Sequence, residues 1–523
     1  MNVALLLAHA AQSFPNRPAL QWRGETLDYA TFQARSAAFA AWLAEVGVAS
    51  QQRVVLFLDN QPELLIAMFG TFHAGGTVVP CNSRLTVDEL SFMVQDCDAQ
   101  VIVTDAEHAE VALAAAGAHR TVLIAGQDFD NALNANQAPA ALAEVAPTDT
   151  AWIFYTSGTT GRPKGAMLSH AALIFVTVSW LADLTPLDEH DITLHVAPLS
   201  HGAGFHALAA TARAALQIIP SVTSFDPEAI LELIRDSGVT NTWMVPTQIV
   251  MLTNAAPQGL TLPTLKYVVY GGAPITPTAM TRALHTFGSI FVQLYGQGET
   301  PMTATILRRC EHLPEFLGSA GRVRPGVELR IVGPDGNVLA ADEVGELVLR
   351  GPALMSGYWN RPDATAETIV DGWLHTGDLA RITTDGVVFL LDRTKDLIIS
   401  GGSNIYAVEV EQVLARHPLV AEVAVIGVSD DLWGELVVAV VVAHVTAQNG
   451  EDQDHGPSRD RSNELLNSHC RQALAGYKVP RRYEFVDALP RNGYGKVLKR
   501  QLREQFGAEP ETQPDGRWTR SRP

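Results

Sequence analysis

Short apolar runs alternate with helix-like stretches between about residue 50 and about residue 300. The run RVVLFL at residues 53–58 is followed by PELLIAMFGTFHAG, and TVVP is followed by TVDELSFMVQD. The later runs AWIFYTS, KYVVYGG and IFVQLYG continue this order, with the helical pattern DPEAILELIRDSG among them. Strands that alternate with helices pair in parallel, because each helix carries the chain back across the sheet. The alternation predicts an α/β fold of stacked, mostly parallel sheets covered by helices.

The pattern changes twice in the C-terminal part of the chain. After about Gly321 the runs VELRIVGPDG, VGELVLRG and GVVFLLDR are separated by Gly and Asp turns, which predicts antiparallel hairpins. Beyond Arg393 the order helix, strand, strand, helix, strand, helix predicts a small α+β unit. The expected domains are a large one over 1–392 with its β subdomain over about 321–392, a mobile C-terminal one over 393–508 and a flexible tail over 509–523.

Composition and charge exclude several classes of protein. A chain of 523 residues is too long for one compact core, and 47% hydrophobic with 18% charged residues is typical of globular proteins. The polar segment at residues 447–463 is expected to be a surface loop. The formal charge of −19, without a Lys/Arg stripe, argues against nucleic acid as a partner.

The cysteines and the N-terminus bear on location. The four cysteines are far apart and form no CxxC pair, which fits reduced thiols in a cytoplasm and argues against a cysteine-bound metal. No Lys or Arg precedes the apolar stretch in MNVALLLAHAAQSF, so a first helix is expected there rather than a signal peptide. No window approaches the ~20 apolar residues that cross a bilayer. We therefore expect a cytoplasmic protein, and the sequence leaves a homodimer open.

Residues 155–165 read YTSGTTGRPKG, directly behind an apolar run. Amides and hydroxyls at the end of a strand can hold a phosphate, and glycines let the backbone approach it. Lys164 adds a positive charge. The spacing does not match the P-loop pattern G-x-x-x-x-G-K-[ST]. Taken alone, this stretch leaves open a phosphate loop of another kind and a flexible polar turn.

Further motifs occur in a definite order: YGQGET at 295–300, HTGD at 375–378, DRTKDLIISGGSNIYAVEVE at 392–411 and PRNGYGKVLKR at 490–500. Together with the first loop they resemble the adenylate-forming superfamily of acyl-CoA synthetases, peptide-synthetase adenylation domains and beetle luciferases. The resemblance covers nearly the whole chain and is closest to bacterial aryl-acid and fatty-acid CoA ligases. It implies that a carboxylate attacks the α-phosphate of ATP, giving an acyl adenylate and pyrophosphate, and that the thiol of coenzyme A then displaces AMP.

The resemblance also implies roles for individual residues. The residues implied for ATP binding are Thr156, Ser157, Gly158, Thr159, Thr160, Gly161 and Lys164 at the phosphates, Gly271, Gly272, Ala273 and Tyr295 at the adenine, and Asp378 and Arg393 at the ribose. Gly296, Gln297 and Gly298 of the YGQGE motif are implied for binding the nucleotide as well. Glu299 is implied as a Mg²⁺ ligand, which suits a hard cation. Taken singly, Glu299, Tyr295 and Asp378 could equally be a helix-terminal acid, a core-edge aromatic and a turn residue.

The C-terminal motifs carry the remaining implied roles. Lys496 would bridge the substrate carboxylate and the α-phosphate, and Lys395 would be the hinge on which the small domain turns between the two steps. Ser400, Gly401 and Gly402 would line the path of the pantetheine arm. A solvated surface lysine and a plain glycine turn are the alternatives for these positions.

One position departs from the family pattern YGxTE. Gly298 stands where relatives usually carry Thr, so the hydroxyl contact to the α-phosphate is missing there. Thr300 or Gln297 are the candidates to replace it.

The segment APLSHGAGFHAL aligns with the family region that lines the acyl pocket. The expected pocket residues are Trp180, His201, Phe205, Trp243, Leu294, Gly296 and Met302, which make a mostly apolar wall. No Arg or Lys can be placed in that wall, which disfavours a dicarboxylate. His201 is expected between substrate and the CoA channel, with a core histidine as the alternative.

The expected activity is an ATP-dependent acid–thiol ligase with an aryl acid of benzoate or cinnamate type as substrate. A medium- or long-chain fatty acid is the alternative substrate. A carrier-loading adenylation enzyme and a non-catalytic nucleotide-binding relative are the rival classes. ATP, Mg²⁺ and coenzyme A are the expected cofactors.

Overall fold

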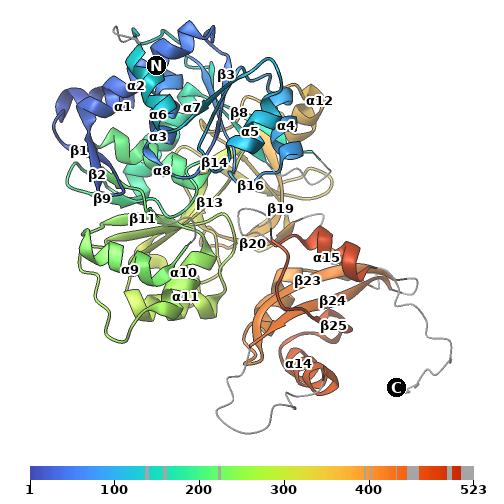
Figure 1. The fold of residues 1–523 in the computed structure, drawn as a ribbon. Coiled ribbons are helices and arrows are strands. Elements are labelled where there is room, and N and C mark those ends of the chain that lie inside the picture. The colour runs from blue at the N-terminus through green and yellow to red at the C-terminus, as the bar shows by residue number, and fades with distance from the viewer. Residues whose placement is uncertain are drawn as a thin grey trace. The chain divides into compact units, whose positions relative to one another are not determined.

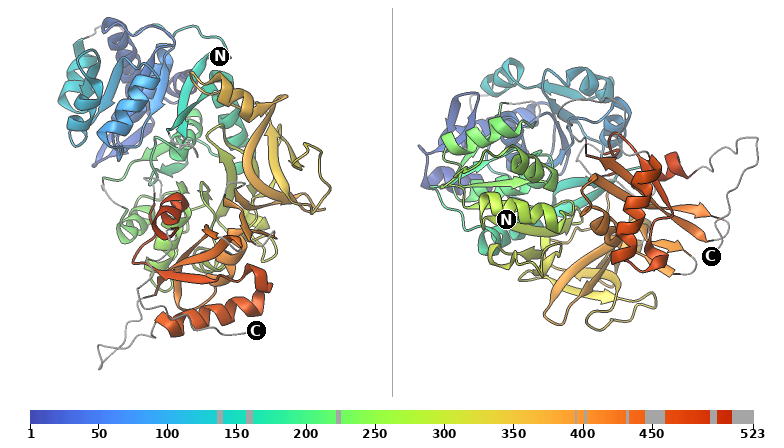
Figure 2. Two further views of the ribbon diagram at one scale, coloured as in Figure 1. Left: turned by 90° about the vertical axis from the view of Figure 1, so that its right-hand side faces the viewer. Right: turned by 90° about the horizontal axis from the view of Figure 1, so that it is seen from below.

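The computed structural model describes residues 1–135, 140–156, 162–221, 225–393, 396–400, 403–430, 433–444, 459–491 and 497–507. The chain divides into two compact units, and Figures 1 and 2 show the elements of each. The first unit is Met1–Thr376 with Ala380–Leu390, and the second is Gly377–Leu379 with Leu391–Pro523. The predicted domain boundary after residue 392 stays a prediction.

The first unit contains a six-stranded sheet of order β6-β5-β3-β4-β7-β8, parallel except for the edge pair β7–β8. Its strands are β3 (Arg53–Phe57), β4 (Thr77–Pro80), β5 (Val101–Thr104), β6 (Thr121–Ile124), β7 (Thr150–Thr156) and β8 (Lys164–Ser169). β4 and β5 are buried along their whole length, as continuous Val/Ile runs covered on both faces require. The helices of this region are α1 (Leu5–Ser13), α2 (Tyr29–Glu45), α3 (Pro62–His73), α4 (Val87–Asp96), α5 (Ala109–Ala116) and α6 (Gln127–Ala135).

The other sheet has fourteen strands, in the order β16-β17-β19-β20-β15-β14-β13-β12-β11-β9-β10-β1-β2 with β18 paired to β19. It belongs to the first unit except for Gly377–Leu379 of β19 and the end of β20. Its N-terminal strands are β1 (Pro18–Trp22), β2 (Glu25–Asp28), β9 (Ile192–Leu194), β10 (Leu216–Ile218), β11 (Asn241–Met244), β12 (Tyr267–Tyr270) and β13 (Phe291–Gln297). The others are β14 (Thr300–Leu307), β15 (Gly321–Val323), β16 (Glu328–Val332), β17 (Gly345–Arg350), β18 (Ile369–Val370), β19 (Trp373–Ile382) and β20 (Val387–Arg393).

The pairing changes sense at β13 in this large sheet. β1, β10, β9, β11, β12 and β13 pair in parallel, whereas β13–β14, β14–β15 and β15–β20 pair antiparallel. The strands of the predicted β subdomain therefore continue the parallel sheet. The associated helices are α7 (His170–Ser179), the π-helix η1 (Trp180–Leu184), α8 (Gly202–Ala212), α9 (Pro227–Asp236), α10 (Pro246–Ala255), α11 (Pro277–Phe287), η2 (Arg309–Glu311) and α12 (Pro362–Thr368).

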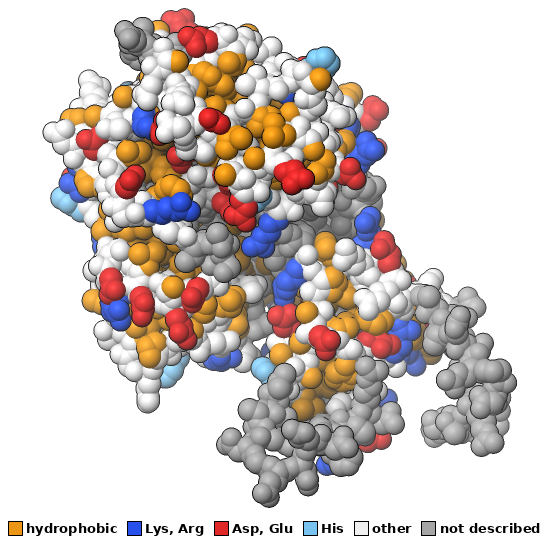
Figure 3. All heavy atoms as spheres, in the orientation of Figure 1, with side chains coloured by type: hydrophobic (Ala, Val, Ile, Leu, Met, Phe, Trp, Pro, Cys, Tyr) orange, Lys and Arg blue, Asp and Glu red, His pale blue; other side chains and the backbone are white. Residues whose placement is uncertain are grey.

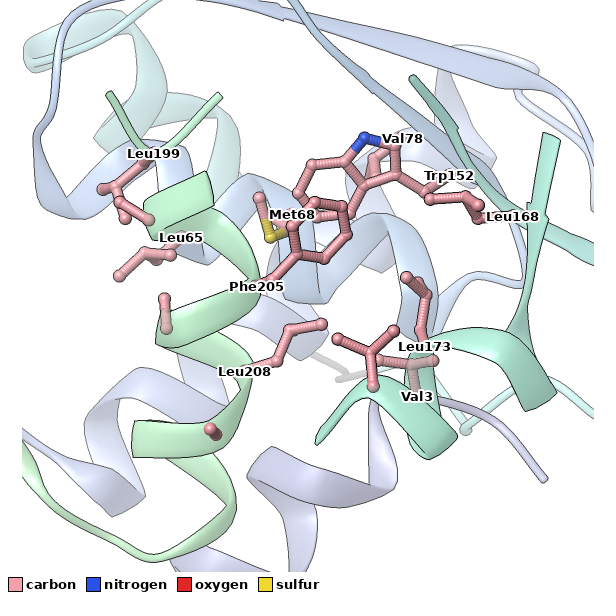
Figure 4. Packing of buried hydrophobic residues seen from close by; sticks show 14 of the residues in the cluster. Val3, Leu65, Met68, Val78, Trp152, Leu168, Leu173, Leu199, Phe205 and Leu208 are labelled. Carbon is pink, nitrogen blue, oxygen red and sulfur yellow. The ribbon is translucent and has the colours of Figure 1, made fainter. Parts of the chain in front are cut away.

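Buried side chains hold these layers together. The main core joins the two sheets through α3, α7 and α8, and Figure 4 shows Trp152 of β7 lying over Phe205 of α8, near Met68 of α3. The two rings are stacked with centroids 4.7 Å apart. A second cluster packs α4 and α5 on the six-stranded sheet, and a third packs α9, α10 and α11 on the large sheet. The predicted α/β class is confirmed.

The second unit has its own five-stranded sheet, of order β22-β21-β24-β23 with β25 beside β24. Its elements are β21 (Ile398–Ser400), β22 (Ser403–Ile405), α13 (Ala407–Leu414), β23 (Val420–Asp430), β24 (Gly434–Ala443), α14 (Arg459–Ala473), η4 (Gly476–Lys478), β25 (Arg482–Phe485) and α15 (Lys499–Phe506). The apolar run of β24 packs on α13 and α14 on one face and on α15 on the other.

Two surface properties are relevant to partners. On the face drawn in Figure 3, the Lys and Arg side chains of the described residues are scattered among acidic and neutral ones. Within the described ranges, no helix combines the length and the apolar character that crossing a membrane demands.

Candidate active site

Two hairpins, one from each sheet of the first unit, meet at the YTSGTTGRPKG and YGQGET motifs. The β7–β8 hairpin carries Thr156 at the end of β7 and Lys164 at the start of β8. The turn between β13 and β14 carries Glu299. The Thr156 hydroxyl donates to Glu299 Oε1 at 3.4 Å. Two motifs far apart in sequence are thereby in contact.

Glu299 is buried, with 8% of its surface exposed, and a second hydroxyl reaches it. Tyr358 donates its phenolic hydrogen to Glu299 Oε1 at 2.6 Å. Burial and the charge of Glu299 raise the pKa of Tyr358, so its phenol stays protonated and remains a donor. Lys164 Nζ lies 5.1 Å from the centre of the Tyr358 ring, within cation–π range.

Tyr358 was missed by sequence reasoning, because it lies outside the five motifs, in a segment that forms an isolated β-bridge with Ala166 of β8. The segment around it pairs with β8: Trp359 N–H donates to Gly165 O at 2.8 Å. Asp96, the last residue of α4, supports the same segment. It accepts hydrogen bonds from Tyr155 Oη at 2.8 Å and from Arg361 at 2.6 Å. This network holds Tyr358 beside Glu299.

The surroundings of Glu299 fit a hard cation. The described partners of its carboxylate are neutral hydroxyls, from Thr156 and Tyr358, and buried carboxylates are normally paired with a cation or a metal. Mg²⁺ is typically held by one or two carboxylates and by phosphate oxygens. The assignment of Glu299 as its ligand stays a prediction.

Gly298, the departure from the family pattern, lies where no side chain fits. A Cβ there would be 2.5 Å from Thr156 Cγ2 and 2.6 Å from Phe154 Cδ1. The Phe154 ring thus fills the space that a threonine would need. Of the two expected substitutes, Thr300 is buried with its hydroxyl 3.2 Å from that of Thr303, and Gln297 Nε2 donates to Thr376 O at 2.9 Å.

Four of the expected pocket residues come together beside this turn. Trp180 of η1 and Trp243 of β11 meet edge to face, with centroids 6.4 Å apart. A Cβ on Gly202 would lie 2.7 Å from both Trp243 and Met302, so these side chains converge there. Leu294 and Trp243 converge in the same way on Gly271, at 3.0 Å each. The side chains that meet here are aliphatic or aromatic, and their role as an acyl pocket stays a prediction.

His201 and Phe205 lie along α8 and its N-cap. The His201 ring meets Phe154 edge to face at 5.0 Å, and its Nδ1 lies 3.1 Å from Ser200 Oγ. Burial lowers the pKa of His201 to about 3, so the imidazole is neutral at neutral pH. Phe205 is almost fully buried, between Trp152 and Phe154, which places it in the core as well as behind the expected pocket.

The expected adenine residues lie at strand ends, whereas the ribose residue Asp378 lies within a strand. Gly271, Gly272 and Ala273 come directly after β12, and Tyr295 and Gly296 lie near the end of its parallel neighbour β13. Ligands of open α/β sheets bind at such carboxyl ends. Asp378 is buried on β19, and the backbone of Arg393 ends β20.

In the second unit, Ser400 is buried at the end of β21. The expected residues outside the described part of the chain are Ser157, Gly158, Thr159, Thr160, Gly161, Lys395, Gly401, Gly402 and Lys496.

Comparisons with known proteins agree with the order of these motifs. Residues 7–359 match the family described as AMP-binding enzyme, and residues 409–496 match the AMP-binding enzyme C-terminal domain. A feruloyl-CoA synthase from Amycolatopsis sp is 39% identical over 501 residues, covering 95% of this chain and 97% of the relative. A fatty acid–[acyl-carrier-protein] ligase, ScoC from Streptomyces coeruleorubidus, is 35% identical and covers 95% of each chain.

Solved structures share the fold. ATP-bound MatB from Rhodopseudomonas palustris superposes with a TM-score of 0.86 at 30% identity, covering 97% of this chain and 99% of that one.

Proposed function

Because this chain belongs to the AMP-binding enzyme family, we propose that it ligates an aromatic carboxylic acid to coenzyme A. The class of reaction follows from the family and its named relatives: the protein is an AMP-forming acyl-CoA synthetase that uses ATP and coenzyme A. The finer proposal is that the acid is an aryl acid of benzoate or cinnamate type. The observation that carries it is the aromatic contact of Trp180 with Trp243 and the convergence of Trp243 and Met302 at Gly202.

The chemical problem is charge repulsion, since the carboxylate and the triphosphate are both anions. Lys164 and the amides and hydroxyls of its loop are proposed to hold the β- and γ-phosphates. Glu299 and its hydroxyl partner Thr156 are proposed to hold Mg²⁺, which when bound adds positive charge at the phosphate oxygens. Lys496 is proposed to bring its ammonium to the reacting carboxylate, and Lys395 to be the hinge of the mobile domain.

The neutral state of His201 supports an uncharged substrate body. An imidazole that stays neutral offers no cation to a second carboxylate at that end of the pocket. Flat aromatic walls also suit a planar ring, because stacked and edge-to-face contacts add to the burial of apolar area. The relative that acts on a fatty acid supports the alternative, a medium- or long-chain alkyl acid.

Two further proposals concern the setting of the enzyme. The four cysteines are free thiols, three of them buried, which supports a reducing compartment such as the cytoplasm. A homodimer remains a proposal on the sequence alone.

The experiment measures the two half-reactions separately over a panel of acids. Pyrophosphate release from acid and ATP should be fastest with benzoates or cinnamates, and slower with octanoate and palmitate. Thioester formation should follow with free coenzyme A and not require a carrier protein. Lys496→Ala should lose the first half-reaction and keep thioester formation from supplied acyl adenylate. Preference for an alkyl acid, or for the carrier protein over coenzyme A, would overturn the aryl-acid ligase.

A further inference from the structure

A buried arginine lies behind the pocket wall in which sequence reasoning placed no cation. Arg324 follows β15 and is 2% exposed, among the largest fully buried side chains of the described residues. Its guanidinium forms an ion pair with Asp183, with Nη2 2.5 Å from Asp183 Oδ1 and Nε 3.1 Å from the same oxygen. Side chains of this kind are rarely buried unless they are paired.

The same guanidinium binds two backbone carbonyls. Nη2 donates to Ser179 O at 2.6 Å, and Nη1 donates to Met302 O. Ser179 ends α7, and Asp183 belongs to η1, the π-helix that begins with Trp180. One side chain therefore ties together the segment of Trp180 and the backbone of Met302, two of the expected pocket residues.

Both tied segments have unusual backbones. η1 is a π-helix of five residues, a rare geometry that is frequent at functional sites. Met302 has φ +58°, a left-handed conformation that a non-glycine residue seldom adopts. Such conformations persist only where surrounding contacts determine them. Arg324 provides a contact to each.

The Trp180 side chain has partners of its own, apart from Arg324. Trp180 Nε1 donates to Thr185 Oγ1 at 2.7 Å, and the ring stacks on His206 with centroids 4.7 Å apart. Thr185 and His206 thus fix the orientation of the Trp180 ring. The backbone turn that carries Trp180 is fixed separately, by Arg324 and Asp183. Met302 meets Trp243 across Gly202.

We propose that Arg324, paired with Asp183, is a positioning residue that sets the size of the acyl pocket by holding the Trp180 turn and the Met302 backbone against each other. Its guanidinium is buried and bound to Asp183, Ser179 O and Met302 O, so we assign it an indirect role through these partners. This inference rests on the proposed function and deepens it, because it names what limits the bulk of the acid. Loss of the pair should loosen the end of the pocket and favour larger acids.

The test exchanges the ion pair for apolar residues of similar volume. Arg324→Met/Asp183→Leu removes both charges together, which buried ion pairs often tolerate. Pyrophosphate release is measured with benzoate and with a 4-substituted cinnamate, together with the KM for ATP. The ratio of kcat/KM for the large acid over the small acid should rise about 10-fold, through the KM of the acid. The KM for ATP should not change.

Arg324→Lys is the conservative variant, and a matched control comes from the exposed Arg350–Glu328 pair of β16 and β17 at 2.8 Å. Arg324→Lys keeps a charge for Asp183 but not the fork to the carbonyls, so its selectivity should fall between wild type and the double variant. Arg350→Met/Glu328→Leu should leave the ratio as in wild type. An unchanged ratio in a folded Arg324→Met/Asp183→Leu, or an equal loss for both acids and ATP, would overturn the proposal. Wild-type protein inactive with every acid would instead overturn the proposed function.

Discussion

Two carboxylates of the first unit, the partly buried Asp183 and the buried Glu299, have different partners. Asp183 is paired with the guanidinium of Arg324 at 2.5 Å, within a backbone of unusual geometry. Glu299 accepts hydrogen bonds from the hydroxyls of Thr156 and Tyr358, with Lys164 near the ring of Tyr358. The first acid has its cation built into the protein. The second is held by neutral donors, which suits a site where a ligand supplies the positive charge.

The difference separates a structural role from a chemical one. Removing one partner of a buried ion pair leaves the other charge without compensation, so the cost appears in folding. A buried carboxylate whose cation comes from a bound ligand carries a desolvation penalty in the free protein. Its removal relieves that penalty, so we expect a loss of activity and not of stability. Each variant below tests whether the two regions divide in this way.

Asp183→Asn should show the largest effect, on stability. It leaves the buried guanidinium of Arg324 without a charged partner, which costs about 3–5 kcal/mol. Urea unfolding followed by tryptophan fluorescence measures the loss. Asp342→Asn, at the half-exposed pair with Arg381, is the matched control and should stay near the wild-type value. Equal stabilities for the two variants would show that the Asp183–Arg324 ion pair does not stabilise the fold.

Glu299→Gln should lose activity and keep stability. We expect a fall of about 10²–10³-fold in kcat for pyrophosphate release, as for a removed electrostatic contact in an active site. The melting temperature should equal or exceed that of wild type, because an amide is cheaper to bury than a carboxylate.

Tyr358→Phe is the graded companion of this variant. It removes one hydrogen bond to Glu299, and kcat should fall about 10–100-fold if Glu299 is the proposed Mg²⁺ ligand, as for outer partners of a metal ligand. If Glu299→Gln forms the adenylate at a near-normal rate, Glu299 has no part in the active site.

Gly298→Thr should push its new side chain against β7, beside Glu299. The new Cβ would overlap Thr156 and Phe154, and overpacking typically costs about 1–3 kcal/mol. Activity should fall because Thr156, displaced, no longer reaches Glu299. The additional change Phe154→Ala should recover part of the lost stability and part of the lost activity, because it removes the ring that the new threonine side chain would overlap. If the double variant is no better than the single one, Phe154 is not what excludes a threonine.

Acid should give the most gradual effect, because it is spread over several pH units. Burial lowers the pKa of His195 to about 4 and holds the pKa of His206, which stacks on Trp180, well below its ordinary value. The unfolded chain binds protons on these groups near pH 6.5, while the native state does not, so stability present above that pH is lost as the pH falls towards 4.

The slope is about 1.4 kcal/mol per pH unit for each such histidine. Urea unfolding at several pH values measures it. His195→Gln should lose one histidine's share of the slope. A slope identical to that of wild type would mean that His195 is not neutral in the native state.

The sequence by itself determined the α/β class, the family and the approximate extent of most elements. These follow from local patterns: the period of apolar residues, the capping box of Thr86 and Glu89 that begins α4, and motifs whose residues are adjacent along the chain. Glu299 was predicted because it lies in a motif, whereas Trp180 and Trp243 lie outside the motifs and were expected only from the resemblance to the family.

Only the tertiary structure decided the partners. Tyr358 reaches Glu299 from 59 positions away and Arg324 reaches Asp183 from 141 positions away, and no local pattern marks either residue. The same holds for Gly298, whose lack of a side chain makes sense only once Phe154 and Thr156 pack against it. Contacts between sheets depend on how layers stack, which is a property of the folded chain as a whole. The sequence therefore indicates which groups are candidates for chemistry, and the packing of the folded chain decides which partners each of them has.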